Sequence, residues 1–162
     1  IEGGIMRKEE INLGSKKYLD FQVRNELYGI PIEYVTEIVG IQPISNIPKV
    51  PEYMKGIINL RGKIIPIVDM GLKLNKNAAE YTDRTCIIVV SINNSNIGLI
   101  VDSISEVLNI ADEQIEPINN LKFTDTNGYL SGIAKLGDKV SLVLNYTKLF
   151  CNEDLKITEQ CI

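Results

Sequence analysis

The chain has 162 residues, 44% of them hydrophobic, and a formal net charge of -4, so it can fold as one globular domain or as two small fused modules. The 17 basic residues are scattered and no apolar run approaches the roughly 18 residues of a membrane span, which argues against nucleic acid as a partner and against membrane insertion. Histidine is absent, and with it the imidazole on which most zinc sites and catalytic triads depend.

Residues 1–5, "IEGGI", are expected to be a remnant of cloning in front of a native start at Met6. Apolar and polar residues then alternate in "YLDFQVR" (18–24), which predicts a strand with one apolar face. Asn25 and Glu26 separate this strand from the apolar run "LYGIPI". We therefore expect a β-hairpin at the start of the fold.

The chain contains an internal repeat. "YGIPIEYVTEIVGI" (28–41) aligns with "IGLIVDSISEVLNI" (97–110) after a shift of 69 residues, and "GIINLRGKIIPIVD" (56–69) aligns with "GIAKLGDKVSLVLN" (132–145) after a shift of 76. Identical pairs include Gly29 and Gly98, Glu37 and Glu106, Ile41 and Ile110, Gly56 and Gly132, Leu60 and Leu136, and Lys63 and Lys139. The repeat indicates a duplicated fold.

Each repeat predicts about five short strands, the size of a small barrel. The predicted fold class is mainly β: two fused SH3-like five-stranded β-barrels related by internal duplication, with a few short helices. Residues 16–74 form the first barrel and 84–150 the second, the ends of the chain being free to cross over, and 151–162 form a C-terminal helix or tail. Asp69 and Asn145 are the predicted N-caps of short helices at "MGLKL" and "YTKLF".

The stretch "GIINLRGKIIPI" (56–67) invites comparison with a phosphate-binding loop, G-x-x-x-x-G-K-[ST]. It does not fit, because five residues separate Gly56 from Gly62 and Ile64 replaces the hydroxyl that would bind magnesium. The second repeat has "LGDK" (136–139) at the same place. Both segments are explained by a hairpin turn, with Gly62 as a structural turn residue.

Two kinds of charged residue leave alternatives open. Arg61 is either a solvated turn residue or a rigidly presented guanidinium suited to a partner's carboxylate or carbonyl groups. Glu37 and Glu106 could suggest an acid and a base, but repeated surface glutamates of a duplicated fold are the stronger interpretation. We find no nucleophile, metal-ligand cluster or dinucleotide motif, so the sequence predicts a binding module without catalysis, metal or cofactor.

The cysteines, Cys86, Cys151 and Cys161, are odd in number and none lies at CxxC spacing. We therefore expect neither a disulfide framework nor a zinc site. We expect a reducing, cytoplasmic location. Cys86 lies in the apolar run "TCIIVVSI", where we expect a buried small side chain rather than a reactive thiol.

Three segments, "YGIPIEYVTEI", "ISNIPKVPEYMKGIINLRGKIIPIVDM" and "IGLIVDSISEVLNI", resemble the CheW family of bacterial chemotaxis coupling proteins. The resemblance covers nearly the whole chain and is most specific from Ile47 to Asp69; Met70 and Gly71 stand where the family often has leucine and arginine. It implies a non-enzymatic adaptor between the cytoplasmic tip of methyl-accepting chemoreceptors and the histidine kinase CheA. It also implies a cytoplasmic protein recruited to membrane receptor arrays, with other CheW copies as further partners.

The resemblance also implies which residues contact these partners. The receptor's helical hairpin is expected in the groove between the barrels, against Val35, Glu37, Gly56, Arg61 and Val107. The regulatory domain of CheA resembles the same fold, and Leu121 is the expected contact with it.

Two other functions stay open from the sequence. The chain could be the detached regulatory domain of such a kinase, or a binder of small molecules in the cleft between barrels.

Overall fold

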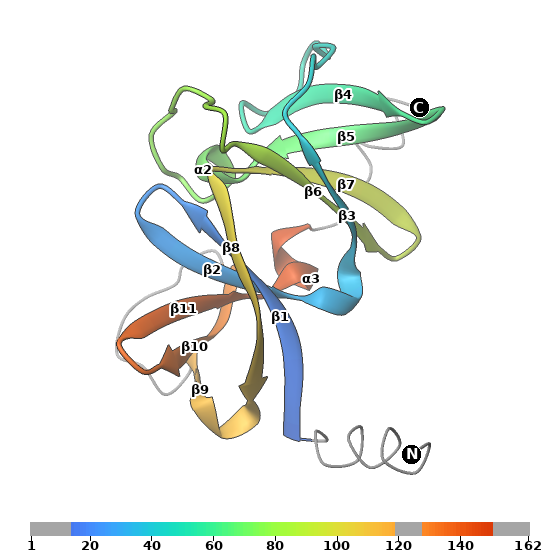
Figure 1. The fold of residues 1–162 in the computed structure, drawn as a ribbon. Coiled ribbons are helices and arrows are strands. Elements are labelled where there is room, and N and C mark those ends of the chain that lie inside the picture. Colours follow the sequence, from blue (N-terminus) through green and yellow to red (C-terminus); the bar gives the residue numbers. More distant parts are fainter. Residues whose placement is uncertain (1–13, 119–127, 151–162) are drawn as a thin grey trace.

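The computed structural model describes residues 14–118 and 128–150, which form two β-sheets, one above the other in Figure 1. The six-stranded sheet has the order β8-β1-β2-β11-β10-β9 and the five-stranded sheet the order β3-β6-β7-β5-β4. The strands are β1 (Ser15–Val23), β2 (Glu26–Pro31), β3 (Val35–Gly40), β4 (Met54–Leu60), β5 (Lys63–Asp69), β6 (Cys86–Ile92), β7 (Ser95–Val101), β8 (Ser103–Ala111), β9 (Ile115–Pro117), β10 (Leu130–Leu136) and β11 (Lys139–Leu144). The predicted mainly β architecture is confirmed.

Short helical segments join the strands. They are the α-helices α2 (Met70–Lys73) and α3 (Tyr146–Leu149) and the 3-10 helices η2 (Ile32–Tyr34) and η3 (Asp112–Gln114). The predicted N-caps are confirmed: Asp69 Oδ1 accepts a hydrogen bond from Leu72 N at 3.2 Å, and Asn145 Oδ1 accepts one from Lys148 N at 3.3 Å. No helix in the described ranges is long and apolar enough to cross a membrane.

Each sheet combines strands from both repeats of the sequence. The six-stranded sheet takes β1 and β2 from the first repeat and β8 to β11 from the second, whereas the five-stranded sheet takes β3 to β5 from the first and β6 and β7 from the second. Strands of the first repeat join strands of the second by parallel pairing: β2 pairs with β11 in one sheet, and β5 pairs with β7 in the other. The ranges 16–74 and 84–150 are therefore spread over both sheets.

Strand registers repeat with the spacing of the sequence repeat. Val143 pairs with Gly29 in the six-stranded sheet, and their counterparts Ile67 and Gly98 pair in the five-stranded sheet. The bulges repeat too: β3 is irregular between Val35 and Glu37, and β8 is irregular at the equivalent residues opposite Asp20 and Phe21. Strand β9, which pairs with β10, has no strand among the described residues as its counterpart in the five-stranded sheet. At the equivalent place a single β-bridge joins Ser45 to Ile57. The two sheets are thus related by the duplication.

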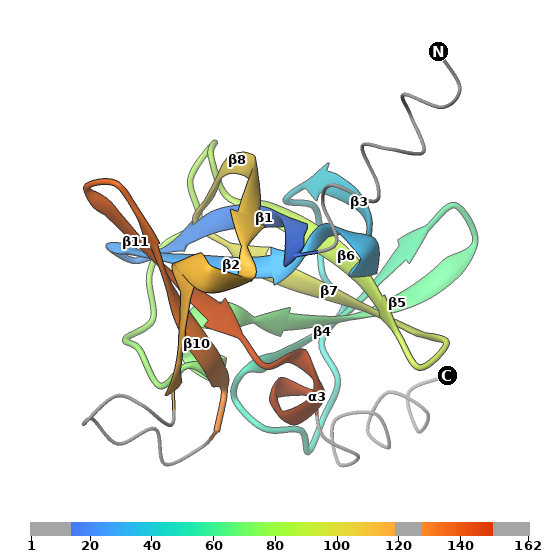
Figure 2. The same ribbon diagram turned by 90° about the horizontal axis from the view of Figure 1, so that it is seen from below.

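Within the described part of the chain, buried apolar side chains form three hydrophobic clusters. The largest lies between the sheets and includes Phe21, Ile30, Val90 and Leu99, with Leu149 of α3. In Figure 1, α3 lies at the level between the two sheets, and Figure 2 shows it at one side of the molecule. The five-stranded sheet encloses a second core of Ile58, Ile65, Ile67, Ile87, Val89 and Ile100. The six-stranded sheet encloses a smaller core of Tyr18, Ile110, Ala134 and Val143. The sheets are therefore held together by extensive apolar contact.

Strand β1 differs from its sequence prediction. Alternation predicted one apolar face, but Tyr18, Leu19, Asp20 and Phe21 are all buried. The reason is position: β1 lies inside the sheet, with Leu19 and Phe21 in the core between the sheets and Tyr18 in the core of its own sheet. Asp20 is thus buried, although alternation placed it among polar residues.

Candidate functional site

The hairpin of β4 and β5 presents Arg61 at its tip. Leu60 pairs with Lys63, so Arg61 and Gly62 are the two loop residues, and both have positive φ, 52° and 85°. Such a pair of φ values is typical of the tight turns whose twist matches that of the flanking strands. The Gly62 N–H donates to Asn59 Oδ1 at 2.9 Å, which closes the turn. Arg61 is therefore carried on a short, braced loop.

Glu37 on the edge strand β3 is the partner of this guanidinium. Arg61 Nη2 donates to Glu37 Oε2, with the arginine side chain 69% exposed and the glutamate 29% exposed. The bulge in β3 lies beside this contact, where Thr36 Oγ1 donates to the carbonyl of Val89 at 3.1 Å. The pair borders a pocket of about 300 Å³ lined by Thr36, Glu37, Leu60, Arg61, Lys63, Ile65 and Asn96. The site thus offers both charges, an apolar wall and an amide.

The second repeat carries a weaker version of the same contact. Glu106 on the edge strand β8, the counterpart of Glu37, lies 3.7 Å from Lys139 Nζ in the hairpin of β10 and β11. Lys139 corresponds to Lys63, and Gly137 takes the place of Arg61. The sequence alignment paired Glu37 with Glu106 and Lys63 with Lys139, but it did not show which basic side chain each glutamate contacts. A guanidinium at the hairpin tip is therefore specific to the five-stranded sheet.

The other predicted receptor residues do not line this pocket. Val35 is half-buried opposite Val90 on β3, two residues before Glu37. Val107 is 52% exposed on β8, an edge strand of the other sheet, and its counterpart Ile38 is 44% exposed on β3. Each edge strand therefore presents an apolar side chain next to its glutamate.

Gly56 is buried and has a backbone purpose. Its φ is +143°, and a Cβ placed there would lie 2.0 Å from the carbonyl oxygen of Ser45. Ser45 and Ile57 exchange two backbone hydrogen bonds of 2.9 Å at this point. Gly56 thus allows the segment after β3 to cross the hairpin that carries Arg61.

The remaining predicted positions include three that the structure does not describe. Leu121 lies outside the described residues, as do Cys151 and Cys161. Cys86 is half-buried, and burial raises the pKa of its thiol, which disfavours the reactive thiolate. Among residues 14–118 and 128–150, no group of three or more acidic or cysteine side chains is placed to hold a metal ion.

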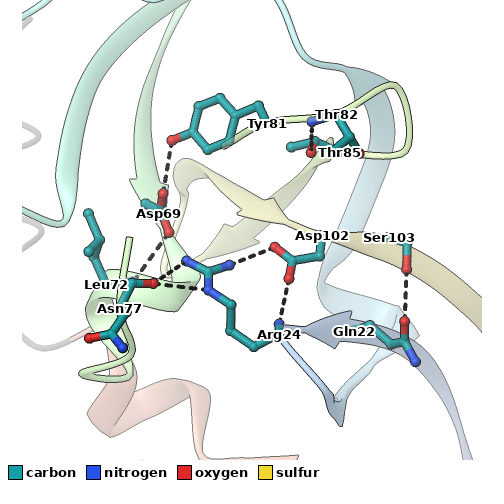
Figure 3. Close-up of polar contacts among 10 residues, drawn as sticks. All are labelled: Gln22, Arg24, Asp69, Leu72, Asn77, Tyr81, Thr82, Thr85, Asp102 and Ser103. Carbon is teal, nitrogen blue, oxygen red and sulfur yellow. Dashed lines mark hydrogen bonds and ion pairs between the residues drawn. The ribbon is translucent and has the colours of Figure 1, made fainter. Parts of the chain in front are cut away.

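A second polar cluster lies where the two sheets meet (Figure 3). Arg24, in the turn between β1 and β2, donates from Nη1 to Asp102 Oδ1 at 2.7 Å and from its backbone N–H to the other carboxylate oxygen. Its Nε and Nη2 donate to the carbonyl of Asn77 at 3.0 and 2.8 Å. Nearby, Tyr81 donates to Asp69 Oδ2 at 2.8 Å. These groups satisfy one another, as expected of a structural clasp.

Removing the exposed charge pair is expected to leave the fold intact. Arg61→Ala should lower the free energy of unfolding by less than about 1 kcal/mol, because exposed ion pairs contribute only about 0.2–1 kcal/mol. Urea denaturation followed by circular dichroism measures this, with Glu37→Gln as the matched change in the partner. A larger loss in either variant would mean that the pair holds the hairpin in place.

Comparison with known proteins identifies the family. The family model described as CheW-like domain matches residues 17–154. The chain belongs to this family. It is 33% identical over 144 residues to the chemotaxis protein CheW of Klebsiella aerogenes, covering 89% of this chain and 87% of that protein. It is 30% identical over 136 residues to the CheW of Bacillus subtilis, with 84% and 86% covered.

A solved CheW structure supports the same assignment. The scaffolding protein TtCheW from Thermoanaerobacter tengcongensis superposes with a TM-score of 0.77 at 39% sequence identity, over 83% of this chain and 92% of that one. Residues 17–154, which the family model matches, include strands of both sheets described above. The CheW resemblance of the sequence and the two-sheet fold are therefore confirmed together.

Proposed function

We propose that the chain is a chemotaxis adaptor that couples methyl-accepting chemoreceptors to the histidine kinase CheA and thereby controls kinase activity. Membership of a family of chemotaxis scaffolds makes it a scaffold rather than an enzyme. The observation that carries the proposal is Arg61, presented on a braced hairpin tip against Glu37 beside a pocket of about 300 Å³. A guanidinium held in this way needs little reordering to engage a partner's carboxylate or carbonyl groups.

The receptor tip is the proposed occupant of this surface. The half-buried Val35 and the exposed Val107 supply apolar contact for one face of a receptor helix, and Gly56 sets the path of the backbone behind it. The charges of Arg61 and Glu37 set the register and orientation of that helix, and the Arg61 guanidinium also contributes to its affinity. Signalling then proceeds through shifts in the population of kinase states in a cytoplasmic array recruited to the membrane.

The kinase contact is proposed at the ends of the barrels, with Leu121 as one position and further copies of the chain as alternative neighbours. An internal duplication gives each molecule two similar sheet edges, one at β3 and one at β8, which suits head-to-tail pairing with a related fold. Binding to the isolated regulatory domain of CheA, measured by calorimetry with Leu121→Ala, tests this part separately.

The receptor contact makes the first prediction about binding. In an NMR titration of the ¹⁵N-labelled chain with a receptor-tip fragment, Arg61→Ala should weaken binding about tenfold or more, as truncation of a central arginine commonly does. Lys139→Ala is the control, because it removes the exposed basic partner of Glu106, the counterpart of Glu37, from the other sheet. Shift changes should gather at Val35, Glu37, Arg61 and Val107.

Two results would contradict the receptor proposal. One is equal affinity of wild type and Arg61→Ala for the fragment. The other is a thermal shift produced by small metabolites and not by the fragment, which would favour a ligand-binding protein.

A further inference from the structure

Asp20 is a carboxyl group buried in the middle of the six-stranded sheet. Its residue is 1% exposed, and Ser141 Oγ donates to Asp20 Oδ1 at 3.2 Å. Gly29 pairs with Asp20 across β1 and β2, and a Cβ at Gly29 would lie 2.9 Å from Asp20 Oδ1 and 3.2 Å from Ser141 Oγ. The three residues therefore form a small polar site in which the missing side chain of Gly29 leaves space for the carboxyl and hydroxyl groups.

The duplicated fold does not require a carboxyl group at this position. The counterparts of Asp20 and Ser141 in the five-stranded sheet are Val89 and Ile65, both members of its inner core. Val89 pairs with Glu37 just as Asp20 pairs with Glu106. The same position is thus apolar in one sheet and ionisable in the other.

The groups around Asp20 come from each neighbouring strand. Glu106 faces it from β8 and Lys139 and Ser141 from β11, while β2 offers Gly29 without a side chain. On β1 itself, Tyr18 lies two residues away and stays neutral, because burial raises the pKa of its hydroxyl above 10.0. Burial raises the pKa of Asp20 to about 6, with Glu106 adding to the rise and the Ser141 hydrogen bond and Lys139 opposing it.

We propose that Asp20 is a pH-sensitive element that tightens the part of the six-stranded sheet formed by β8, β1, β2 and β11 when protonated and loosens it when ionised. The effect is local because the inner core of this sheet is small, whereas the core between the sheets lies on the other face of β1. Val107, directly after Glu106 on β8, moves with this unit. An effect of this movement of Val107 on receptor binding rests on the proposed function. The loosening of the strands around Asp20 does not.

The sign of the pH effect follows from the raised pKa. Asp20 holds its proton more strongly in the folded protein than in the opened one, so the stabilisation is fully present below about pH 4 and is lost as pH rises through about 6. Between pH 5 and 7.5 the opening equilibrium should therefore increase about tenfold.

Amide hydrogen exchange on the full ¹⁵N-labelled chain measures this opening, after correction for intrinsic exchange rates. We expect protection in β8, β1, β2 and β11 to fall about tenfold from pH 5 to 7.5 relative to protection in β6 and β7. Asp20→Asn should abolish the difference. Glu106→Gln should keep the pH-dependent difference in protection but lower the pH of its midpoint, because the substitution removes a neighbouring negative charge. Ser141→Ala should raise the pH of the midpoint, because it removes the hydrogen bond to the carboxylate.

Equal pH dependence in the two groups of strands, or an unchanged difference in Asp20→Asn, would overturn the proposal. If the variants do not fold, a ¹³C NMR titration of the Asp20 carboxyl group in the wild-type chain measures the pH midpoint of its ionisation directly. A midpoint of about 6 supports the proposal, and a midpoint at or below about 4 overturns it. Loss of receptor binding in Arg61→Ala tests the proposed function independently of all these outcomes.

Discussion

Gly56→Ala is expected to lower the free energy of unfolding by about 3–5 kcal/mol, a large loss for a single methyl group. Two costs add. The φ of +143° strains any residue with a Cβ, at roughly 1–3 kcal/mol. The new Cβ would also lie 2.0 Å from the Ser45 carbonyl oxygen, so the two backbone hydrogen bonds between Ser45 and Ile57 must break or the segment must move.

Thermal and urea denaturation of the variant measure the loss, and Gly137→Ala is the matched control. Gly137 also has positive φ, +64°, but no atom lies within 4 Å of the position of its Cβ. Its substitution should cost about 1 kcal/mol, since only backbone strain is added. Equal losses at the two glycines would show that the close approach of Ser45 has no energetic weight.

The repeat in the sequence predicted a large part of the fold, because duplicated segments must form similar strands with similar registers. Gly29 and Gly98 show this: they align in sequence and pair with equivalent strands of different sheets. Which strands become neighbours was not predictable from periodicity. Alternation reports which face of a strand is buried, whereas the parallel pairing of β2 with β11 joins segments far apart along the chain.

Two of the seven residues that line the Arg61 pocket were singled out from the sequence, but their contact was not predicted. Arg61 and Glu37 were singled out, one because the repeats differ there and the other because they agree. Their ion pair depends on how the hairpin of β4 and β5 lies against β3, and strand order alone places those strands at opposite edges of the five-stranded sheet. The curvature of the sheet brings these edges together, and curvature has no local sequence signal.

The burial of Asp20 was not predicted from the sequence. In "YLDFQVR" alternation assigns Asp20 to a polar face. A strand inside a curved sheet that packs on both faces buries both sets of side chains, and β1 is such a strand. A buried carboxyl group of this kind is visible only once the neighbours of the strand are known.

Arg24→Ala is expected to lower the free energy of unfolding by about 2–4 kcal/mol, although Arg24 is remote from the Arg61 pocket. Its side chain is 22% exposed and joins the turn after β1 to Asp102, which links β7 of one sheet to β8 of the other. Truncation leaves Asp102 without its guanidinium and the Asn77 carbonyl without two donors. Losing one partner of a partly buried, hydrogen-bonded charge pair typically costs this much.

Arg24→Lys separates the contribution of the positive charge from that of the shape of the guanidinium. The fork of Arg24 reaches Asp102 on one side and Asn77 on the other, as Figure 3 shows, and it fills the space beside Gly71, where a Cβ would lie 2.3 Å from Nη2. A lysine keeps the charge but not the fork, so Arg24→Lys should recover about half of the loss or less. Lys139→Ala, which removes an exposed partner 3.7 Å from Glu106, should stay within about 0.5 kcal/mol. Full recovery in Arg24→Lys would assign the stabilisation to charge alone, and it would contradict a clasp built on the shape of the guanidinium.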